Sequence, residues 1–278
     1  MQDAFAHGAE LVRAADHDRF IASLFAPAEH RGAIYALYAF NCEVARVREV
    51  AREPLPGEIR LQWWSDVINR QRSDEARANP VASALLTTIE RYRLSSAKLI
   101  DLIEARRFDL YDEPMAALTD LEAYASKTSS ALFALAAQIL AGVDAEAVST
   151  PAGIAFAIAG LLRAFPRHAT RGQLYLPMEL LDRHQVRPDD IFAGRSSAGL
   201  QAALAELGDL GRRHLDAAHQ RMAALPRQAV PALLPVALAR PTLVRLERCD
   251  PFSPAEIAPW RRQWLIWRAA RNPARIAG

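Results

Sequence analysis

The sequence contains little that predicts β-structure. Runs of alternating β-branched residues are absent, and alanine, leucine, arginine and glutamate dominate the chain. These residues favour helices, whereas strands are usually rich in valine, isoleucine, threonine and aromatic side chains. The sequence therefore predicts an all-α protein.

Cysteine, secretory signals and long apolar runs are also scarce. Cys42 and Cys249 are the only cysteines, too few for a disulfide framework or a zinc site, and they fit a reducing cytoplasm. Residues 1–20 include acidic side chains and lack the apolar core of a secretory signal. The longest apolar candidate, 229–244, is interrupted by prolines and Arg240, so no uncharged run of about 18 residues exists. We expect a cytoplasmic protein without a transmembrane helix, and a peripheral position at the inner membrane stays open.

Lysine is nearly absent. Lys98 and Lys127 are the only lysines, so arginine supplies almost all of the 34 basic side chains. Arginine binds phosphate and carboxylate through two parallel hydrogen bonds and tolerates partial burial better than lysine, although a GC-rich genome produces the same bias. Because the formal net charge is only +2, no dominant basic field exists, and we expect no nucleic-acid partner.

Common catalytic motifs are missing as well. The sequence has no P-loop, no dinucleotide-binding glycine pattern and no Gly-x-Ser-x-Gly nucleophile turn. Kinase, dehydrogenase and hydrolase functions are therefore not indicated. None of these patterns points to a catalytic residue, a metal ligand or a cofactor.

What is present is a succession of helices. No internal repeat or Ser/Gly linker divides the 278 residues, so we predict a single domain over 1–278. Prolines stand near the proposed boundaries, where the first helical turn tolerates them. The predicted helices cover residues 8–25, 27–51, 56–73, 80–92, 95–111, 118–141, 147–167, 176–185, 196–224, 227–247 and 253–272, with a loop at 186–199.

The helix within residues 31–50 is predicted to lie at the centre of the protein. Its apolar face recurs at a spacing of three and four residues, and that face consists of Ile34, Leu37, Tyr38, Asn41, Val44 and Ala45. The helix ends in a charged stretch that contains Arg46, Arg48 and Glu49. A second stretch, 153–177, begins with small residues, becomes basic and ends in an apolar run.

Several segments together resemble the squalene/phytoene synthase family. They are the YAF of residues 38–40, the LLR of 161–163, the YLP of 175–177, PLPGEIRLQWW at 54–64, YASKTSSALFAL at 124–135 and the tryptophan-rich end. The chain is most similar to a divergent branch of that family, which contains the mitochondrial assembly factor for respiratory complex I and its alphaproteobacterial relatives. The resemblance implies a helical bundle of the isoprenoid-synthase type around a central cavity.

The family's synthases carry an aspartate-rich motif on each of two helices, and these carboxylates hold the magnesium ions that bind a prenyl diphosphate. The first motif falls on Ala45, Arg46 and Glu49 of this sequence, and the second falls on Ala164 and His168. Alanine and arginine cannot ligate magnesium, which prefers oxygen donors. The resemblance therefore implies a pseudoenzyme, and magnesium is expected only if the chain is a working prenyltransferase.

Three interpretations of the changed cavity stay open. The first is a plain core or an empty pocket. The second is a pocket in which guanidinium groups grip an anion without metal, lined by Arg46, Arg48, Arg163, Arg167, His168 and Arg171 beside Ala45, Glu49 and Ala164. The third is residual catalysis by other acids, such as Asp66 or Glu58.

The last predicted helix is the best candidate for an interaction surface. Trp260, Trp264 and Trp267 form one stripe at helical spacing. The neighbouring basic residues are Arg261, Arg262, Arg268 and Arg271. Such a stripe is often docked on the protein's own core, but a basic helix with tryptophans also suits a membrane surface or a partner groove.

The sequence thus predicts a non-catalytic protein whose expected role rests on the resemblance alone. That role is an assembly or chaperone-like factor for respiratory complex I, with complex I subunits or assembly intermediates as partners. The alternatives are a prenyltransferase that condenses prenyl diphosphates, and a metal-independent carrier of an isoprenoid or an anionic lipid.

Overall fold

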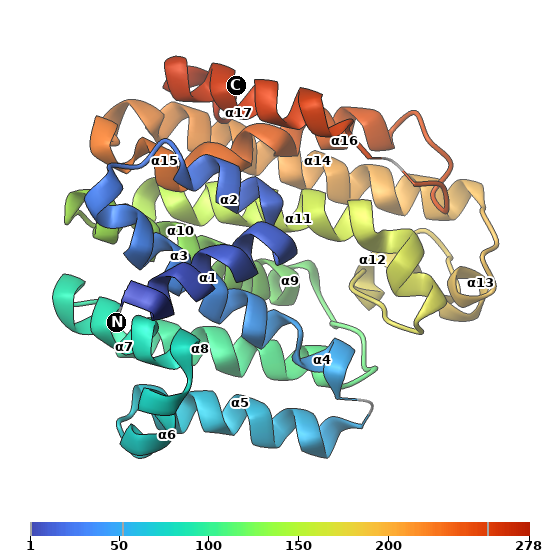
Figure 1. The fold of residues 1–278 in the computed structure, drawn as a ribbon. Coiled ribbons are helices and arrows are strands. Elements are labelled where there is room, and N and C mark those ends of the chain that lie inside the picture. Colours follow the sequence, from blue (N-terminus) through green and yellow to red (C-terminus); the bar gives the residue numbers. More distant parts are fainter. Residues whose placement is uncertain (1, 52, 255) are drawn as a thin grey trace. The chain divides into compact units, whose positions relative to one another are not determined.

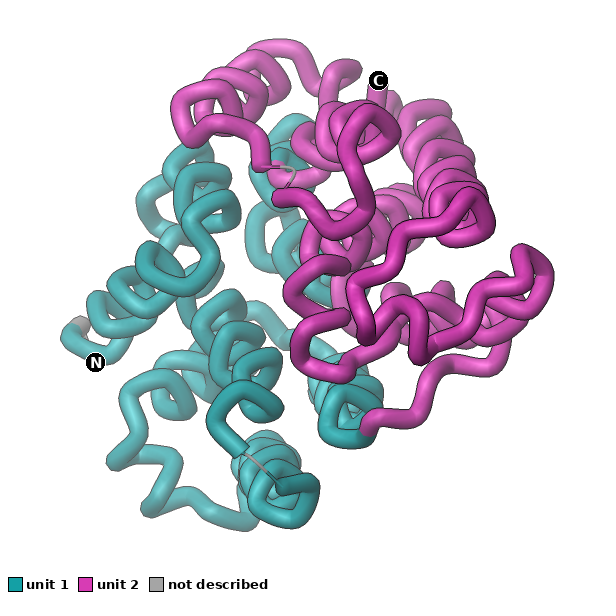
Figure 2. Tube along the Cα trace, turned by 90° about the vertical axis from the view of Figure 1, so that its right-hand side faces the viewer, with its two compact units in different colours: residues 1–111, 131–146, 225–234 teal, residues 112–130, 147–224, 235–278 magenta. Residues whose placement is uncertain are grey.

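The protein consists of helices joined by turns. The computed structural model describes residues 2–51, 53–254 and 256–278, and no strand occurs among them (Figure 1). The predicted all-α class is confirmed. The chain forms two compact units that are interleaved in sequence (Figure 2), with residues 1–111, 131–146 and 225–234 in unit 1 and residues 112–130, 147–224 and 235–278 in unit 2. A single continuous domain and a central cavity stay predictions.

Unit 1 is built mainly from the N-terminal helices. Its elements are α1 (Gln2–Ala15), α2 (His17–Ser23), α3 (Ala28–Ala45), α4 (Val47–Val50), α5 (Pro54–Ile68), α6 (Ser73–Ala78), α7 (Pro80–Tyr92), α8 (Ser96–Arg107), η1 (Phe108–Leu110), α10 (Ala131–Ala141), η4 (Arg227–Ala229) and α15 (Val230–Leu233).

The helix α3 is the centre of unit 1. It packs against α1, α2, α7, α8 and α10, and every side chain from Ala33 to Cys42 is buried. Tyr38 and Phe40 are among the largest fully buried side chains of the protein. A helix enclosed on all sides needs apolar residues around its whole circumference. The sequence predicted the central position of this helix, but it predicted a single buried face.

A buried ion pair joins α2 to this core. The Arg19 side chain is 6% exposed, and its Nη1 lies 2.5 Å from a carboxylate oxygen of Asp16. The guanidinium also lies 5.5 Å from the ring centroid of Tyr38 and 5.6 Å from that of Phe133. Burial alone would lower the pKa of Arg19, but Asp16 outweighs it, so the pKa is raised and the guanidinium stays charged.

Unit 2 contains the longest helices. Its elements are α9 (Leu118–Ala125), the π-helical turn η2 (Ser126–Ser130), nearly all of α11 (Glu146–Thr170), α12 (Met178–Arg183), α13 (Pro188–Phe192), α14 (Ala198–Arg221), η3 (Met222–Ala224), nearly all of η5 (Leu234–Leu238), α16 (Ala239–Leu246), α17 (Pro259–Arg271) and η6 (Pro273–Arg275).

Two glycines allow close packing in unit 2. A Cβ atom added to Gly153 in α11 would lie 2.3 Å from the Cα of Ser130, so the backbone of α11 approaches the π-helical turn. The hydroxyl of Ser130 donates a hydrogen bond of 2.8 Å to the carbonyl of Thr150 on α11. On α14, a Cβ at Gly211 would lie 3.2 Å from both Ile158 and Leu243. Side chains at these glycines would force the helices apart.

Several predicted helices are divided or displaced. The segment 8–25 breaks at Asp16, whose side chain accepts a hydrogen bond from the Arg19 backbone N–H at 3.1 Å and thereby caps α2. The predicted helix 118–141 contains a π-helical turn, and the predicted loop 186–199 contains α13. The last helix begins at Pro259, not at residue 253, because proline occupies its first turn.

Two helical segments meet the length and composition of a membrane span. These are Glu146–Thr170 and Arg227–Leu246. Both contain charged side chains, so neither is an uncharged run of the kind that the sequence lacks. Their apolar windows are 56% and 67% buried within the structure, which is the pattern of core helices.

Candidate functional site

The first set of predicted site residues lies in unit 1, where α3 ends. Ala45 is the last residue of α3, and Arg46 follows as an exposed C-cap with φ −86° and ψ −5°. The chain then enters α4, in which Arg48 is half-buried and donates a hydrogen bond of 3.4 Å to the carbonyl of Leu110. Glu49 is exposed. These positions therefore span a break between two helices, and the predicted continuous helix 27–51 was wrong at this point.

The second set lies in unit 2, in the last two turns of α11. Ala164 and His168 are half-buried on one face of the helix, and the His168 ring lies 4.7 Å from the ring of Tyr175. The side chains of His168 and Tyr175 help to line a small apolar cleft, and Ala164 does not line it. The three arginines of this set are exposed, and they are Arg163, Arg167 and Arg171.

The basic residues at the end of α11 also have a structural role. Gly172, with φ +68°, turns the chain out of the helix, and the Gln173 N–H donates a hydrogen bond of 2.9 Å to the His168 carbonyl. Arg167 and His168 stand in the last helical turn. Cations in that position are stabilised by the partial negative charge of the helix end. Part of the basic character predicted for a pocket is thus explained by the helix itself.

The donor atoms at the two motif positions do not fit magnesium. They offer one carboxylate, from Glu49, together with the ring of His168, and the alanines and arginines beside them supply no donor for a hard cation. Among the described residues, no group of three or more His, Cys, Asp or Glu side chains could hold a metal ion. Each set is described within its own unit, and the anion pocket that would combine them stays a prediction.

The acids considered for residual catalysis belong to surface ion pairs in unit 1. Asp66 accepts hydrogen bonds from Gln62 at 2.8 Å and from Arg72 at 2.9 Å, and these bonds lower the pKa of its carboxyl. Glu58 forms an ion pair with Arg107. A carboxylate that is held ionised in this way is poorly suited to act as a general acid.

Of the paired tryptophans on α5, Trp64 belongs to the core and Trp63 is half-buried beside it. Trp64 is buried, and its ring lies 5.2 Å from Phe40 and 5.0 Å from Trp63 in edge-to-face geometry. The indole N–H of Trp63 donates a hydrogen bond of 2.7 Å to Glu75. Both rings line a small cavity of about 200 Å³ in unit 1.

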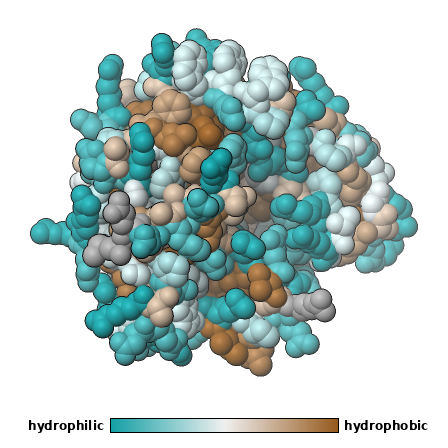
Figure 3. Space-filling model, in the orientation of Figure 1, coloured by the Kyte–Doolittle hydropathy of each residue, from teal (hydrophilic) through white to brown (hydrophobic). Residues whose placement is uncertain are grey.

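The three tryptophans of α17 are exposed. Trp260, Trp264 and Trp267 have exposed fractions of 70%, 45% and 44%. In the space-filling view, near-neutral and hydrophilic side chains share the upper edge of the molecule, where α17 runs (Figure 3). This stripe, which we call the Trp stripe, is not docked on the core of unit 2. A contact with a membrane or a partner stays a prediction.

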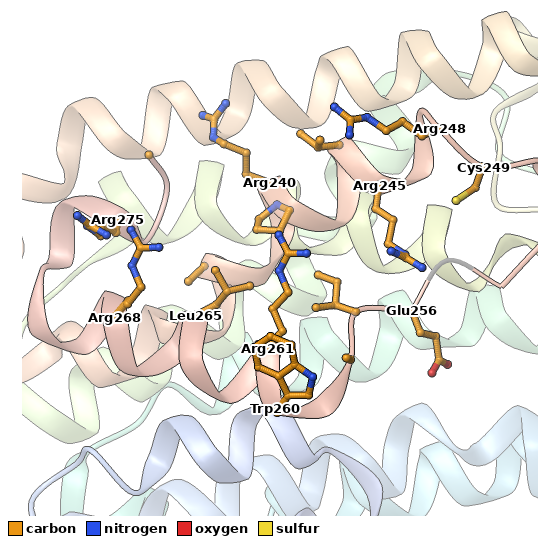
Figure 4. A pocket seen from close by; sticks show the side chains of 16 residues that line it. Arg240, Arg245, Arg248, Cys249, Glu256, Trp260, Arg261, Leu265, Arg268 and Arg275 are labelled. Atoms are coloured by element: carbon orange, nitrogen blue, oxygen red, sulfur yellow. The ribbon is translucent and has the colours of Figure 1, made fainter.

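A groove of about 690 Å³ lies between α16 and α17, directly beside the Trp stripe. Figure 4 shows arginine side chains from both helices reaching into this space, while the Glu256 carboxylate points away from Arg245. We call it the arginine groove, and its basic residues are Arg240, Arg245, Arg248, Arg261, Arg268 and Arg275.

Of these arginines, only Arg261 and Arg268 on α17 were predicted from the sequence to belong to an interaction surface. The signal for the others was available, because Pro241, Val244, Arg245 and Arg248 recur at the spacing of one helix face. What the sequence did not reveal was that this face of α16 opposes α17 across a groove. A second cavity of about 690 Å³, lined mainly by apolar residues of α11, α14 and α16, shares Arg248 and Cys249 with the arginine groove.

Curated relatives cover most of the chain. It is 30% identical over 243 residues to the human NADH dehydrogenase (ubiquinone) complex I assembly factor 6, a match that spans 87% of this chain and 73% of the human protein. The rat protein of the same name is 29% identical over 250 residues, or 89% and 75% of the two chains. A phytoene synthase of Thermus thermophilus is 27% identical over 203 residues, or 71% and 67%.

Experimental structures place the fold. A dehydrosqualene synthase crystallised with a ligand matches with a TM-score of 0.85 at 15% identity, over 97% of this chain and 96% of that one. The squalene synthase HpnC of Alicyclobacillus acidocaldarius matches with a TM-score of 0.77 at 24% identity, over 88% and 94%. The predicted isoprenoid-synthase fold is confirmed. The squalene/phytoene synthase model matches residues 12–268, and the chain therefore belongs to the squalene/phytoene synthase family.

Proposed function

We propose that this protein is a non-catalytic assembly factor for respiratory complex I. The proposal is supported by the relatives named complex I assembly factor 6, which align with nearly nine-tenths of the chain. Its partners would be complex I subunits or assembly intermediates, and its place would be the cytoplasmic side of the inner membrane. The two-unit helical body would act by binding, as a chaperone does.

One observation carries the non-catalytic part of this proposal. By the sequence resemblance, the family's metal-binding aspartates would fall on Ala45, Arg46, Glu49, Ala164 and His168, and of these residues only Glu49 is acidic. Ionisation of an allylic diphosphate depends on metal ions to stabilise the departing negative charge. This donor set does not supply the ligands for those ions.

The assembly role is tested by deleting the gene and measuring assembled complex I on native gels together with NADH-driven quinone reduction. We expect both to fall and to recover when the wild-type gene is returned. A matched control is the double variant Ala45→Ser/Ala164→Ser, which adds small hydroxyls but no magnesium site and should also restore assembly. Normal complex I in the deletion strain would overturn the proposal.

The alternative function is a working prenyltransferase, and the similarity to phytoene synthases favours keeping it in view. Purified protein incubated with farnesyl or geranylgeranyl diphosphate and Mg²⁺ should release no pyrophosphate. A prenyl diphosphate that raises the melting temperature without Mg²⁺, in the wild type but not in Arg46→Ala or Arg163→Ala, would instead support a carrier of an isoprenoid or anionic lipid. Metal-dependent turnover would reject the pseudoenzyme.

A further inference from the structure

The outer side of α17 carries two adjacent stripes. Trp260, Trp264 and Trp267 recur at intervals of four and three residues, and Arg261, Leu265 and Arg268 recur one position later. The second stripe lines the arginine groove, and Trp260 lines it too. One residue corresponds to about 100° of rotation around a helix, so the two stripes are neighbours. They form one continuous surface, whereas Ile266 and Ala269 face the core of unit 2.

Arginine side chains hold the tryptophan rings in place on this surface. The guanidinium carbon of Arg268 lies 4.3 Å from the ring centroid of Trp264, and that of Arg271 lies 4.5 Å from Trp267. Cation–π contacts at this distance stabilise the paired side chains while leaving the outer ring faces accessible. Aromatic rings and positive charges are therefore presented together, in solvent and in fixed positions.

The positive charge of the groove is poorly balanced. Its six arginines share one acidic side chain in the lining, that of Glu256. Arg240 forms an ion pair with Asp216 at 2.6 Å. Within the described ranges 2–51, 53–254 and 256–278, no carboxylate forms an ion pair with the remaining five, which are Arg245, Arg248, Arg261, Arg268 and Arg275. Several cations in one groove repel one another unless an anion is bound.

The shape and chemistry of this surface fit a lipid bilayer. Guanidinium groups bind phosphate oxygens through two parallel hydrogen bonds. Tryptophan is enriched at the head-group level of membranes, because its ring is apolar and its N–H is polar. The Trp stripe runs for about 10 Å along the convex outer side of a helix, so a flat surface can contact all three rings at once.

We propose that the Trp stripe and the arginine groove bind an anionic phospholipid bilayer, with lipid phosphates in the groove and the indole rings among the head groups. The helix α17 would lie in the plane of the interface, as basic amphipathic helices do. This inference adds a molecular contact to the proposed location at the inner membrane, and the choice of a lipid ligand rests on that proposed location. It assigns that contact to defined residues.

The test is co-sedimentation of the full chain with vesicles of phosphatidylcholine alone and with vesicles that also contain phosphatidylglycerol, whose negative surface potential attracts basic residues. We expect binding to the anionic vesicles only, weakened by salt. Three of the five tryptophans lie on α17, so binding should also shift the fluorescence to shorter wavelength. Cys249 in the groove should react more slowly with a maleimide when vesicles are present.

The decisive variant is Arg245→Gln/Arg248→Gln/Arg261→Gln. Each basic residue near an anionic surface strengthens binding about fivefold, so the triple change should weaken partitioning by roughly 100-fold. The control is the triple variant Arg77→Gln/Arg187→Gln/Arg195→Gln, which removes three exposed arginines outside the groove. It lowers the net charge of +2 by the same amount as the decisive variant. It should change partitioning by less than about threefold, because none of these charges belongs to the Trp stripe or the arginine groove.

The remaining outcomes separate the alternatives. Equal partitioning of the two triple variants, or equal binding to neutral and anionic vesicles, would overturn the proposal. Binding to soluble polyglutamate without vesicle binding would replace the bilayer with an acidic protein segment, and displacement from vesicles by millimolar glycerol phosphate would indicate a free phosphate ligand. Because vesicles contain no respiratory subunit, any of these failures leaves the assembly role untouched.

Discussion

Arginine meets aromatic rings in two regions of this molecule, with opposite surroundings. In unit 1, Arg19 lies between Tyr38 and Phe133, is almost wholly buried and is paired with Asp16. In unit 2, Arg268 and Arg271 of α17 stack on Trp264 and Trp267, which stay 45% and 44% exposed. The same contact therefore supports a core in one place and an accessible surface in the other. Burial and the presence of a carboxylate decide which role it has.

The largest expected effect is at the buried contact. Arg19→Met should lower the free energy of unfolding by about 3–5 kcal/mol, because Asp16 is left without its partner next to the core. Arg268→Met on α17 is the matched control and should change it by less than about 0.5 kcal/mol. Urea unfolding followed by circular dichroism measures the free energy of unfolding of both variants. Equal changes would contradict the assignment of the Arg19 contact to the core and of the Arg268 contact to the surface.

Unit 2 has tight packing of its own, so the exposure of α17 does not reflect a loose unit. Gly153→Ala should cost roughly 1–3 kcal/mol, because the new methyl group would lie 2.3 Å from the backbone of Ser130. The control is Gly160→Ala on the same helix, where a Cβ meets no described atom within 4 Å and where alanine favours the helix by about 1 kcal/mol. A stabilised Gly153→Ala protein would contradict this close approach.

The two cysteines allow buried and exposed positions to be compared by their chemical reactivity and not by protein stability. Burial raises the pKa of the Cys42 thiol on α3 to about 12, and nearby Asp16 adds to this effect. Since the thiolate is the reactive form, Cys42 should stay unlabelled by maleimide at pH 7 in the native protein. Cys249 is partly exposed and should react. In the Cys249→Ser variant, where Cys42 is the remaining thiol, labelling only after denaturation would confirm that Cys42 is protected. Rapid labelling of the native variant would contradict it.

The smallest expected effect is at an ion-pair network between α12 and α14. His184 lies 2.7 Å from Glu206, and this hydrogen bond, followed by the charge of Arg183, holds the pKa of Glu206 below its usual 4.5. The lowered pKa stabilises the fold at neutral pH, and this contribution is lost as the pH falls through the folded-state value. Glu206→Gln should therefore cost less than about 1 kcal/mol at pH 7. A difference that stays constant from pH 7 to pH 3 would contradict this assignment.

Helix boundaries could be predicted from the sequence where capping residues and prolines mark them. The helix 80–92 was predicted with both ends correct, because Asn79 caps it, Pro80 begins it and Arg93 ends it in a left-handed conformation. The break at Arg46 and the π-helical turn before α10 were missed. Neither has a distinctive residue pattern, and both depend on how neighbouring elements pack.

The features of the candidate site also differ in how far the sequence could predict them. The prediction that magnesium donors are missing at Ala45 and Ala164 needed the resemblance to place the motif positions and the residue types to judge them, and it stays a prediction. The exposure of the Trp stripe could not be predicted, since a stripe at helical spacing looks the same whether it faces a core or solvent. The arginine groove was missed because two helices adjacent in sequence had to be placed opposite one another before their charges could be added together.

The interleaving of the two units has a consequence for how the chain is made. The helix α3 needs α10, and α10 in turn packs against η4 and α15, which lie more than 80 residues later. A ribosome must therefore complete residue 234 before unit 1 can close, and by then most of unit 2 has already emerged. Fragments such as 1–111 would expose an unfinished apolar surface, so truncation at any point before 234 should yield aggregation and not a smaller folded protein.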